Sequence, residues 1–392
     1  MIINGGTING GTIYDLTDLY SFTIFNFTSN NVGNAGPTLG NLYNYTYAGA
    51  NTGNTWLSST DYFTVPNAWP GYQIWTVPHT GPYRITAAGS RSGLIWVYSS
   101  ANLTYGNAHG RGAVIQGVFN LTRGQKITIL PGQPSANTAY TGTYSTPGGG
   151  GGSFVALGNI ASDGFANLTP LVIAGGGGGP GAWNSNTTSP FPGGWGVTTK
   201  RGGNSAGYFT AGPISNRTGA PGGVNGQGGN THVNINGVVS TNSYDSGGGG
   251  GWSGNGIRFN SGAWSSNTRG FIASPYAGGV GGNSFQDGGV GGLNSTQYGV
   301  PGTSAGGFGG GGGSSPIVGG GGGGYSGGGG GYAGIATSPD SAGGGGSYID
   351  SSATSVATSD GQFDTSNTFN GSAITNLGTY NNAAGYISIV KL

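Results

Sequence analysis

The side chains that most often catalyse reactions or bind metals are few and scattered in this chain of 392 residues. It has no cysteine, and its three histidines are His79, His109 and His232. No two of them stand four positions apart, the spacing that places two histidine ligands on one face of a helix. All ten acidic residues are aspartates, and none follows a calcium-loop pattern. We therefore expect no enzymatic activity, no metal and no cofactor.

The charge of the chain excludes other classes of partner. The formal net charge is +1, and charged residues make up 5% of the chain, against about 25% in a typical soluble domain. Such a balance gives no electrostatic basis for binding nucleic acid. No apolar stretch approaches the roughly 20 residues of a spanning helix, so we expect no membrane insertion.

Aromatic side chains in turn-rich segments suggest recognition rather than catalysis. Aromatic rings among small polar residues, on loops held by a rigid scaffold, are typical of binding surfaces and also suit sugars. The same rings could instead cap the ends of the scaffold, and both interpretations stay open. The candidate receptor-binding residues are Trp183, Phe191, Trp195, Tyr208, Phe209, Trp252, Phe259, Trp264, Phe271 and Tyr276.

Glycine must build the scaffold that positions these rings. There are 93 glycines, and 69 of them lie in residues 148–350. A content this high favours disorder, but an aromatic content of 11% and alternating apolar segments are typical of folded proteins. We therefore expect an ordered protein. Its seven glycine runs are 148–152, 175–179, 247–251, 309–313, 319–324, 327–331 and 343–346.

Between the runs, glycine doublets alternate with single side chains, as in Gly278-Gly279-Val280-Gly281-Gly282. A repeat of three matches the three residues per turn of a polyproline II-type helix. Glycine helices of this kind have no Cβ atoms, so several can lie side by side with each N–H bonding a neighbour's carbonyl. Because ordering glycine costs more entropy than ordering any other residue, the bundle needs a scaffold at its ends. Flexible linkers are the alternative interpretation.

Short alternating segments predict that scaffold. Proline and leucine at positions 37 and 39 predict a single helical turn reaching residue 43. The other apolar segments are short and separated by turn signals, which predicts an all-β sandwich or barrel. The expected strands are 22–25, 72–78, 83–87, 95–98, 114–119, 126–130, 153–155, 171–174, 347–349 and 385–390.

Several of these pieces together resemble a known family. The string Ile74-Trp75-Thr76-Val77-Pro78 is followed, at matching intervals, by 81–89, 112–113, 124–129, 148–155, 171–179, 343–349 and 385–389. This series resembles the glycine-rich domain of the anaplastic lymphoma kinase and leukocyte tyrosine kinase ectodomains, and glycine-rich surface and tail-fibre proteins of viruses and phages. Residues 20–23 and 36–39 look like the lead-in of the viral proteins. The resemblance implies a tumour-necrosis-factor-like jelly-roll sandwich with a packed bundle of polyglycine II helices.

On this basis we expect four parts. Residues 1–66 form an N-terminal anchoring or oligomerisation segment, and 67–180 form the β-sandwich with the first glycine helices. Residues 181–342 form the glycine-helix bundle with its aromatic loops, and 343–392 add the last run and the closing strands.

The expected function is that of a viral or phage surface or fibre structural protein that contacts a host-cell glycan or protein through its loops. Other partners would be further virion proteins or copies of the chain itself, for example in a homotrimer. Residues 1–6 lack the basic and apolar regions of a signal peptide, so we expect the chain to reach the virion surface or cell exterior with particles assembled in the cytoplasm.

Three other functions remain open. One is an extracellular ligand-binding module of the receptor type. Another is a purely architectural capsid or fibril component, which differs from an adhesin only in what its loops touch. A third is ice binding by a slab of glycine helices, for which flat, regularly spaced threonines would be the signature.

Overall fold

The structure is a computed structural model that describes most of the chain. The described residues are 7–8, 11–12, 18–29, 31–48, 53–98, 103–106, 109–139, 146–181, 192–207, 219–231, 245–257, 278–295, 304–332, 340–359, 368–369, 372–373 and 384–392.

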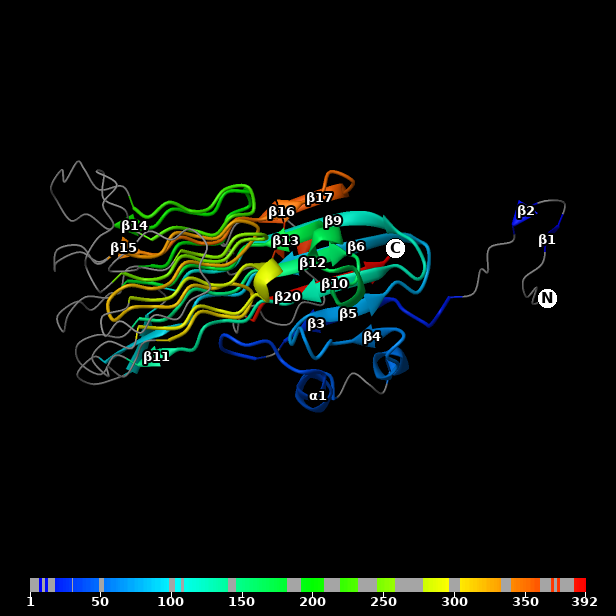
Figure 1. Ribbon diagram of the computed structural model, residues 1–392, viewed down its shortest axis with the longest axis horizontal. Coiled ribbons are helices and arrows are strands. Elements are labelled where there is room, and N and C mark those ends of the chain that lie inside the picture. Colours follow the sequence, from blue (N-terminus) through cyan, green and yellow to red (C-terminus); the bar gives the residue numbers. More distant parts are fainter. Residues whose placement is uncertain are drawn as a thin grey trace.

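Two antiparallel β-sheets form the body of the protein, which confirms the expected all-β class (Figure 1). The first sheet has the strand order β16-β13-β12-β10-β5-β4, and the second has the order β17-β9-β6-β20-β3. The first contains β4 (Phe63–Thr64), β5 (Gln73–Thr76), β10 (Lys126–Leu130), β12 (Ser153–Leu157), β13 (Thr169–Ala174) and β16 (Tyr348–Ile349). The second contains β3 (Ile24–Thr28), β6 (Gly81–Ala88), β9 (Val114–Leu121), β17 (Thr354–Ser359) and β20 (Tyr386–Lys391).

Smaller elements complete the chain. Four additional small sheets are formed by β1 (Thr7–Ile8) with β2 (Gly11–Thr12), by β11 (Thr138–Ala139) with β7 (Ile95–Tyr98) and β8 (Leu103–Gly106), by β14 (Ala206–Gly207) with β15 (Asp340–Ser341), and by β18 (Thr368–Phe369) with β19 (Ser372–Ala373). The helical turns are α1 (Leu39–Asn41), which continues as a π-helical turn over Leu42–Thr46, α2 (Ile160–Asp163), and 3-10 turns at Thr55–Ser58, Phe165–Asn167 and Phe285–Asp287.

The two large sheets share one apolar core, because alternate residues of their strands face each other. On β20, Ile387 and Ile389 are fully buried, and Ile389 pairs with Ile85 of β6. From the opposite sheet, the buried ring of Trp75 lies edge-on to Tyr83, with 5.8 Å between ring centroids. Burial of large alternating side chains on both sheets is what closes the sandwich.

The described residues before 67 contribute to the same core. Phe27 on β3 packs against Trp75, with 6.1 Å between ring centroids, and Trp56 packs edge-on against Phe25 at 5.0 Å. The described residues of 18–66 therefore contribute to the core of the sandwich, and the anchoring role expected for 1–66 stays a prediction. Their role in oligomerisation stays a prediction.

The predicted helical turn is present, with a different first residue. Thr38 is the N-cap of α1, since its hydroxyl accepts a hydrogen bond from the N–H of Asn41. Pro37 precedes the cap instead of starting the helix. A threonine cap satisfies one of the free N–H groups at the helix start.

The seven glycine runs lie together beside the sandwich as extended, nearly parallel segments (Figure 1). The central run is 319–324. Each of the other six runs exchanges backbone hydrogen bonds with it or with the residue next to it. Around the centre their order is 148–152, 175–179, 343–346, 327–331, 247–251 and 309–313, and each run is also hydrogen-bonded to the next.

The hydrogen bonds of the central run repeat every three residues. The N–H groups of Gly321 and Gly324 donate to the carbonyls of Gly247 and Gly250, which belong to one neighbouring run. The N–H groups between them point to other neighbours. Backbone groups in the bundle are therefore paired sideways between segments, which meets the requirement that buried N–H and C=O groups find partners.

The close approach of the runs leaves no space for side chains. An ideal Cβ on Gly322 would lie 2.2 Å from the carbonyl oxygen of Gly176, and one on Gly149 would lie 2.1 Å from that of Gly321. Both distances are far inside van der Waals contact. In the seven runs, all of which the structure describes, positive φ angles occur at Gly309 and Gly310, where the chain turns, and at no other glycine.

Serine ends the runs that enter the sheet. The hydroxyl of Ser153, the first residue of β12, donates to the carbonyl of Ala88 at 2.6 Å and accepts from the N–H of Gly132 at 3.0 Å. Ser347, which ends the last run, makes an equivalent pair of bonds. A hydroxyl can donate and accept at once, so it links the bundle to the first residues of the sheet.

Candidate functional site

Of the ten candidate receptor-binding aromatics, the structure describes two. Trp195 is 40% exposed, whereas Trp252 is 9% exposed. The other eight lie outside the described residues: Trp183, Phe191, Tyr208, Phe209, Phe259, Trp264, Phe271 and Tyr276.

Trp252 packs at the sandwich end of the bundle. Its indole stacks on Phe285, and both rings belong to a buried cluster with Phe154 of β12 and with Tyr72. The hydroxyl of Tyr72 donates to the carbonyl of Phe285. Trp252 therefore joins the bundle to the outer face of the first sheet, in agreement with the capping interpretation, and it does not belong to an exposed binding surface.

Trp195 lies on the side of the bundle. Its neighbours on either side are held by backbone bonds, from the N–H of Gly194 to Ala342 and from that of Gly196 to Arg111, both at 2.8 Å. With the backbone fixed by two adjacent segments and the side chain 40% exposed, the indole is presented to solvent from a rigid support.

Three cations lie on the chain near Trp195. Lys200 and Arg201 follow it at the sandwich end, Arg111 lies on the adjacent segment, and all three side chains are exposed. The ammonium of Lys200 is 4.7 Å from the ring centroid of Tyr348, a cation–π distance. An exposed indole suits a ligand with an apolar face, and exposed cations on the same and the adjacent segment favour one that also carries negative charge. Lys200 and Arg201 stand close to Trp195 in the sequence, but Arg111 is adjacent only through the packing of the bundle.

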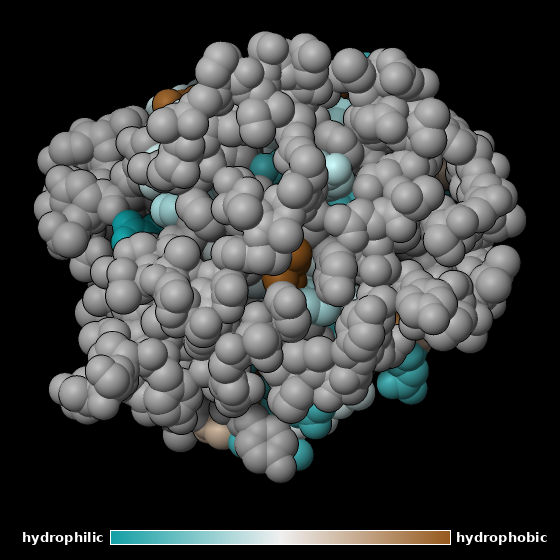
Figure 2. Space-filling model, turned by 90° about the vertical axis from the view of Figure 1, so that its left-hand side faces the viewer, coloured by the Kyte–Doolittle hydropathy of each residue, from teal (hydrophilic) through white to brown (hydrophobic). Residues whose placement is uncertain are grey.

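The two ends of the bundle differ in what lies against them. Bundle segments alternate in direction, and the described turns around Trp252, Phe285 and Tyr325 lie against the sandwich. β14 and β15 lie at the opposite end (Figure 1). Figure 2 looks onto that end, where the described residues that show are mostly hydrophilic, with a small hydrophobic spot near the centre.

A basic cluster lies on the side of the bundle next to the Trp195 segment. Burial, together with the charges of Arg91 and Arg111, lowers the pKa of His109 from 6.5 to about 4. Burial also lowers the pKa of Arg91. The guanidinium of Arg91 donates to the carbonyl of Ser92 at 2.8 Å. His109 is therefore neutral at physiological pH, and it adds no charge to this face.

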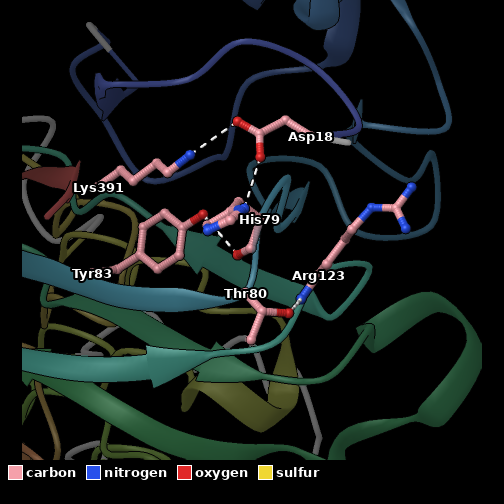
Figure 3. Close-up of polar contacts among 6 residues, drawn as sticks. All are labelled: Asp18, His79, Thr80, Tyr83, Arg123 and Lys391. Carbon is pink, nitrogen blue, oxygen red and sulfur yellow. Dashed lines mark hydrogen bonds and ion pairs between the residues drawn. The ribbon is translucent and has the colours of Figure 1, made fainter. Parts of the chain in front are cut away.

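A second polar cluster lies at the end of the sandwich, away from the bundle (Figure 3). Asp18 stands between His79 and Lys391, with its carboxylate oxygens 2.7 Å from His79 Nδ1 and 2.9 Å from Lys391 Nζ. The hydrogen bond from Lys391, aided by the charges of Lys391 and His79, holds the pKa of Asp18 below its usual range. These groups tie the segment before β3 to the C-terminal strand. An exposed network of this kind contributes about 1 kcal/mol or less.

Other classes of site are not evident in the part of the chain that the structure describes. Its histidines and aspartates form no group of three that could hold a metal ion. None of its helices is long and apolar enough to span a bilayer. No protein-family model matches the sequence, and no curated protein matches it.

Proposed function

We propose that the glycine segments are polyglycine II helices and that the two sheets form a jelly-roll sandwich of the tumour-necrosis-factor type. The three-residue period of the hydrogen bonds from Gly321 and Gly324 supports the first assignment, because a polyproline II-type helix has three residues per turn. The antiparallel strands, whose chain passes repeatedly from one sheet to the other, support the second.

We propose further that the chain is a surface or fibre structural protein of a virus or phage, whose bundle presents loops to a glycan or protein of the host cell. One observation carries this proposal: described segments of the bundle end on the side away from the sandwich, where β11, β14 and β15 lie. Connections on a rigid scaffold are where binding surfaces are usually built. A virion-surface location and assembly with other virion proteins or as a homotrimer belong to the same proposal.

Adsorption to host cells tests the proposal. Purified full-length protein should bind host cells and compete with intact particles, and Trp264→Ala should weaken both effects at least tenfold. The matched control is Val356→Ala, because Val356 is 49% exposed on β17 of the sandwich, away from the bundle's free end. A double variant that carries both Trp264→Ala and Trp195→Ala and still competes with intact particles as well as the native protein would contradict the adhesin function.

A purely architectural role is the second candidate function. Exposed apolar side chains on the side of the bundle favour it. Ile257, Val290 and Leu293 are each at least 39% exposed on its outer segments, where lateral packing between copies would bury them. Protein that sits in a purified particle but does not compete for adsorption would support this role.

A further inference from the structure

Outside the central run and its six neighbours, shorter segments form a second ring around the bundle. Equal rods in hexagonal packing have twelve positions in their second ring, and the described segments fill eleven. Their backbone hydrogen bonds to the first ring or to one another assign these segments to the second ring. The eleven segments are 89–92, 110–113, 132–136, 193–197, 202–205, 220–223, 226–230, 254–257, 279–283, 290–293 and 304–308.

The missing position lies beside the last glycine run. In hexagonal packing each first-ring run has six neighbours, and 175–179, for example, has all six: 319–324, 148–152, 343–346, 89–92, 110–113 and 193–197. Run 343–346 has five within the described ranges: 319–324, 175–179, 327–331, 193–197 and 202–205. The sixth neighbour position of this run lies between 193–197 and 202–205, and no described segment fills it. We call such an outermost neighbour position of a first-ring run a corner.

A backbone donor marks this corner. The N–H groups of Gly343, Gly345 and Gly346 each donate to a carbonyl of an adjacent segment at 2.7–2.8 Å. The N–H of Gly344 has no acceptor among the described residues. In a bundle where nearly every such group is paired between segments, an N–H without a described acceptor marks a position where a further segment can bond.

The two flanking segments leave the nitrogen of Gly344 between them. An ideal Cβ on Gly194 would lie 3.0 Å from this nitrogen, and one on Gly203 would lie 3.2 Å from it. No hydrogen bond joins 193–197 to 202–205 in the described structure. The two segments therefore border the corner without closing it.

The five filled corners show what chemistry fits. The segments there place glycine or backbone against the run beneath them, and 110–113, 254–257 and 290–293 also expose at least one side chain. In 254–257, for example, an ideal Cβ on Gly256 would lie 2.0 Å from the carbonyl oxygen of Gly248, whereas Ile257 is 47% exposed. An occupant of the sixth corner must meet the same condition.

We propose that the corner beside Gly344 is a docking site for an extended glycine-rich segment of a second protein. One carbonyl of that segment accepts the N–H of Gly344, its glycines face the run, and every third side chain points outward. Trp195, whose indole is exposed, belongs to one of the two segments that flank the site. Lys200 and Arg201 are exposed at its sandwich end, so an acidic outward residue is favoured there.

Amide hydrogen exchange in the full-length protein is the first test. The N–H of Gly344 should exchange at least a hundredfold faster than those of Gly343 and Gly345, which are hydrogen-bonded. Equal protection of all three would mean that the corner is already occupied within the chain, and would overturn the proposal.

The second test adds the peptide acetyl-Gly-Gly-Asp-Gly-Gly-Asp-amide at millimolar concentration. We expect slower exchange at Gly344, a changed Trp195 fluorescence, and at least threefold weaker binding to Lys200→Ser. The matched peptide has alanine in place of every glycine and should not bind, because Cβ atoms do not fit against the run. Equal effects of the two peptides, or no effect of the glycine peptide, would overturn the proposal. The outcome is independent of host adsorption.

Discussion

The indole of Trp252 lies flat on the phenyl ring of Phe285, with 4.5 Å between ring centroids and 14° between ring planes. The two rings come from different turns at the sandwich end of the bundle. Phe285 also approaches Phe154 of β12, at 4.9 Å. A glycine bundle has little apolar surface of its own, so these few rings supply much of the hydrophobic contact that holds it against the sheet.

Phe285→Ala should therefore destabilise the protein by about 3–5 kcal/mol, the usual cost of removing a buried phenylalanine ring. Denaturant unfolding followed by tryptophan fluorescence measures the loss. Trp195→Ala is the matched control and should cost less than about 1 kcal/mol, because that ring is 40% exposed. Equal losses in the two variants would mean that the cluster does not anchor the bundle.

Gly322→Ala should destabilise the protein by roughly 3 kcal/mol or more, because its new methyl group would meet the Gly176 carbonyl at 2.2 Å. The control is Gly40→Ala on α1, where the nearest atom to the new Cβ is 4.0 Å away. There alanine should add about 0.5–1 kcal/mol through its better helix propensity. Thermal unfolding of both variants checks the opposite signs, and a harmless Gly322→Ala would disprove tight packing at the centre.

Much of this architecture follows from local sequence patterns. Period-two alternation located β9, β10 and β20 to within two residues, because buried and exposed side chains alternate along a strand. β17 was not expected, since four of its six residues are exposed and Thr354–Ser359 lack an alternating apolar face. β8, at Leu103–Gly106, was also not expected, because it contains a single aliphatic side chain, that of Leu103.

The different exposure of the two described candidate tryptophans could not be predicted from the sequence. Trp195 and Trp252 both follow glycine, and nothing in their local sequence separates the exposed ring from the buried one. The difference arises because Phe285, 33 positions further along the chain, returns to stack on Trp252. The order of the seven runs around 319–324 likewise depends on long-range hydrogen bonds that no local pattern encodes.

Ser153→Ala should cost about 1–3 kcal/mol, since it leaves the buried N–H of Gly132 without the hydroxyl that now accepts it at 3.0 Å. Ser58→Ala, at an exposed position, should change stability by less than about 0.5 kcal/mol. The comparison of the two unfolding free energies checks this. A change at Ser153 as small as the one at Ser58 would indicate that another acceptor replaces the hydroxyl.

Mild acid should destabilise the protein through His109. The pKa of this imidazole falls from 6.5 to about 4 in the folded state, mainly because of burial and also because of Arg91 and Arg111. Between these two pH values the unfolded chain binds a proton that the folded chain does not, so stability falls as the pH is lowered through this range. The full loss is about 3 kcal/mol for a shift of this size.

Replacing the imidazole by a neutral amide separates this effect from the carboxylates. Asp18, Asp163 and Asp350 have lowered pKa values, so the stability they add is lost only below their ordinary value of 3.8. Unfolding free energies of His109→Gln should therefore stay nearly constant from pH 6.5 to 4 and fall only below that range. His79→Gln serves as the control and should keep the native slope above pH 4. A native protein whose stability does not change between pH 6.5 and 4 would show that His109 is protonated in the folded state.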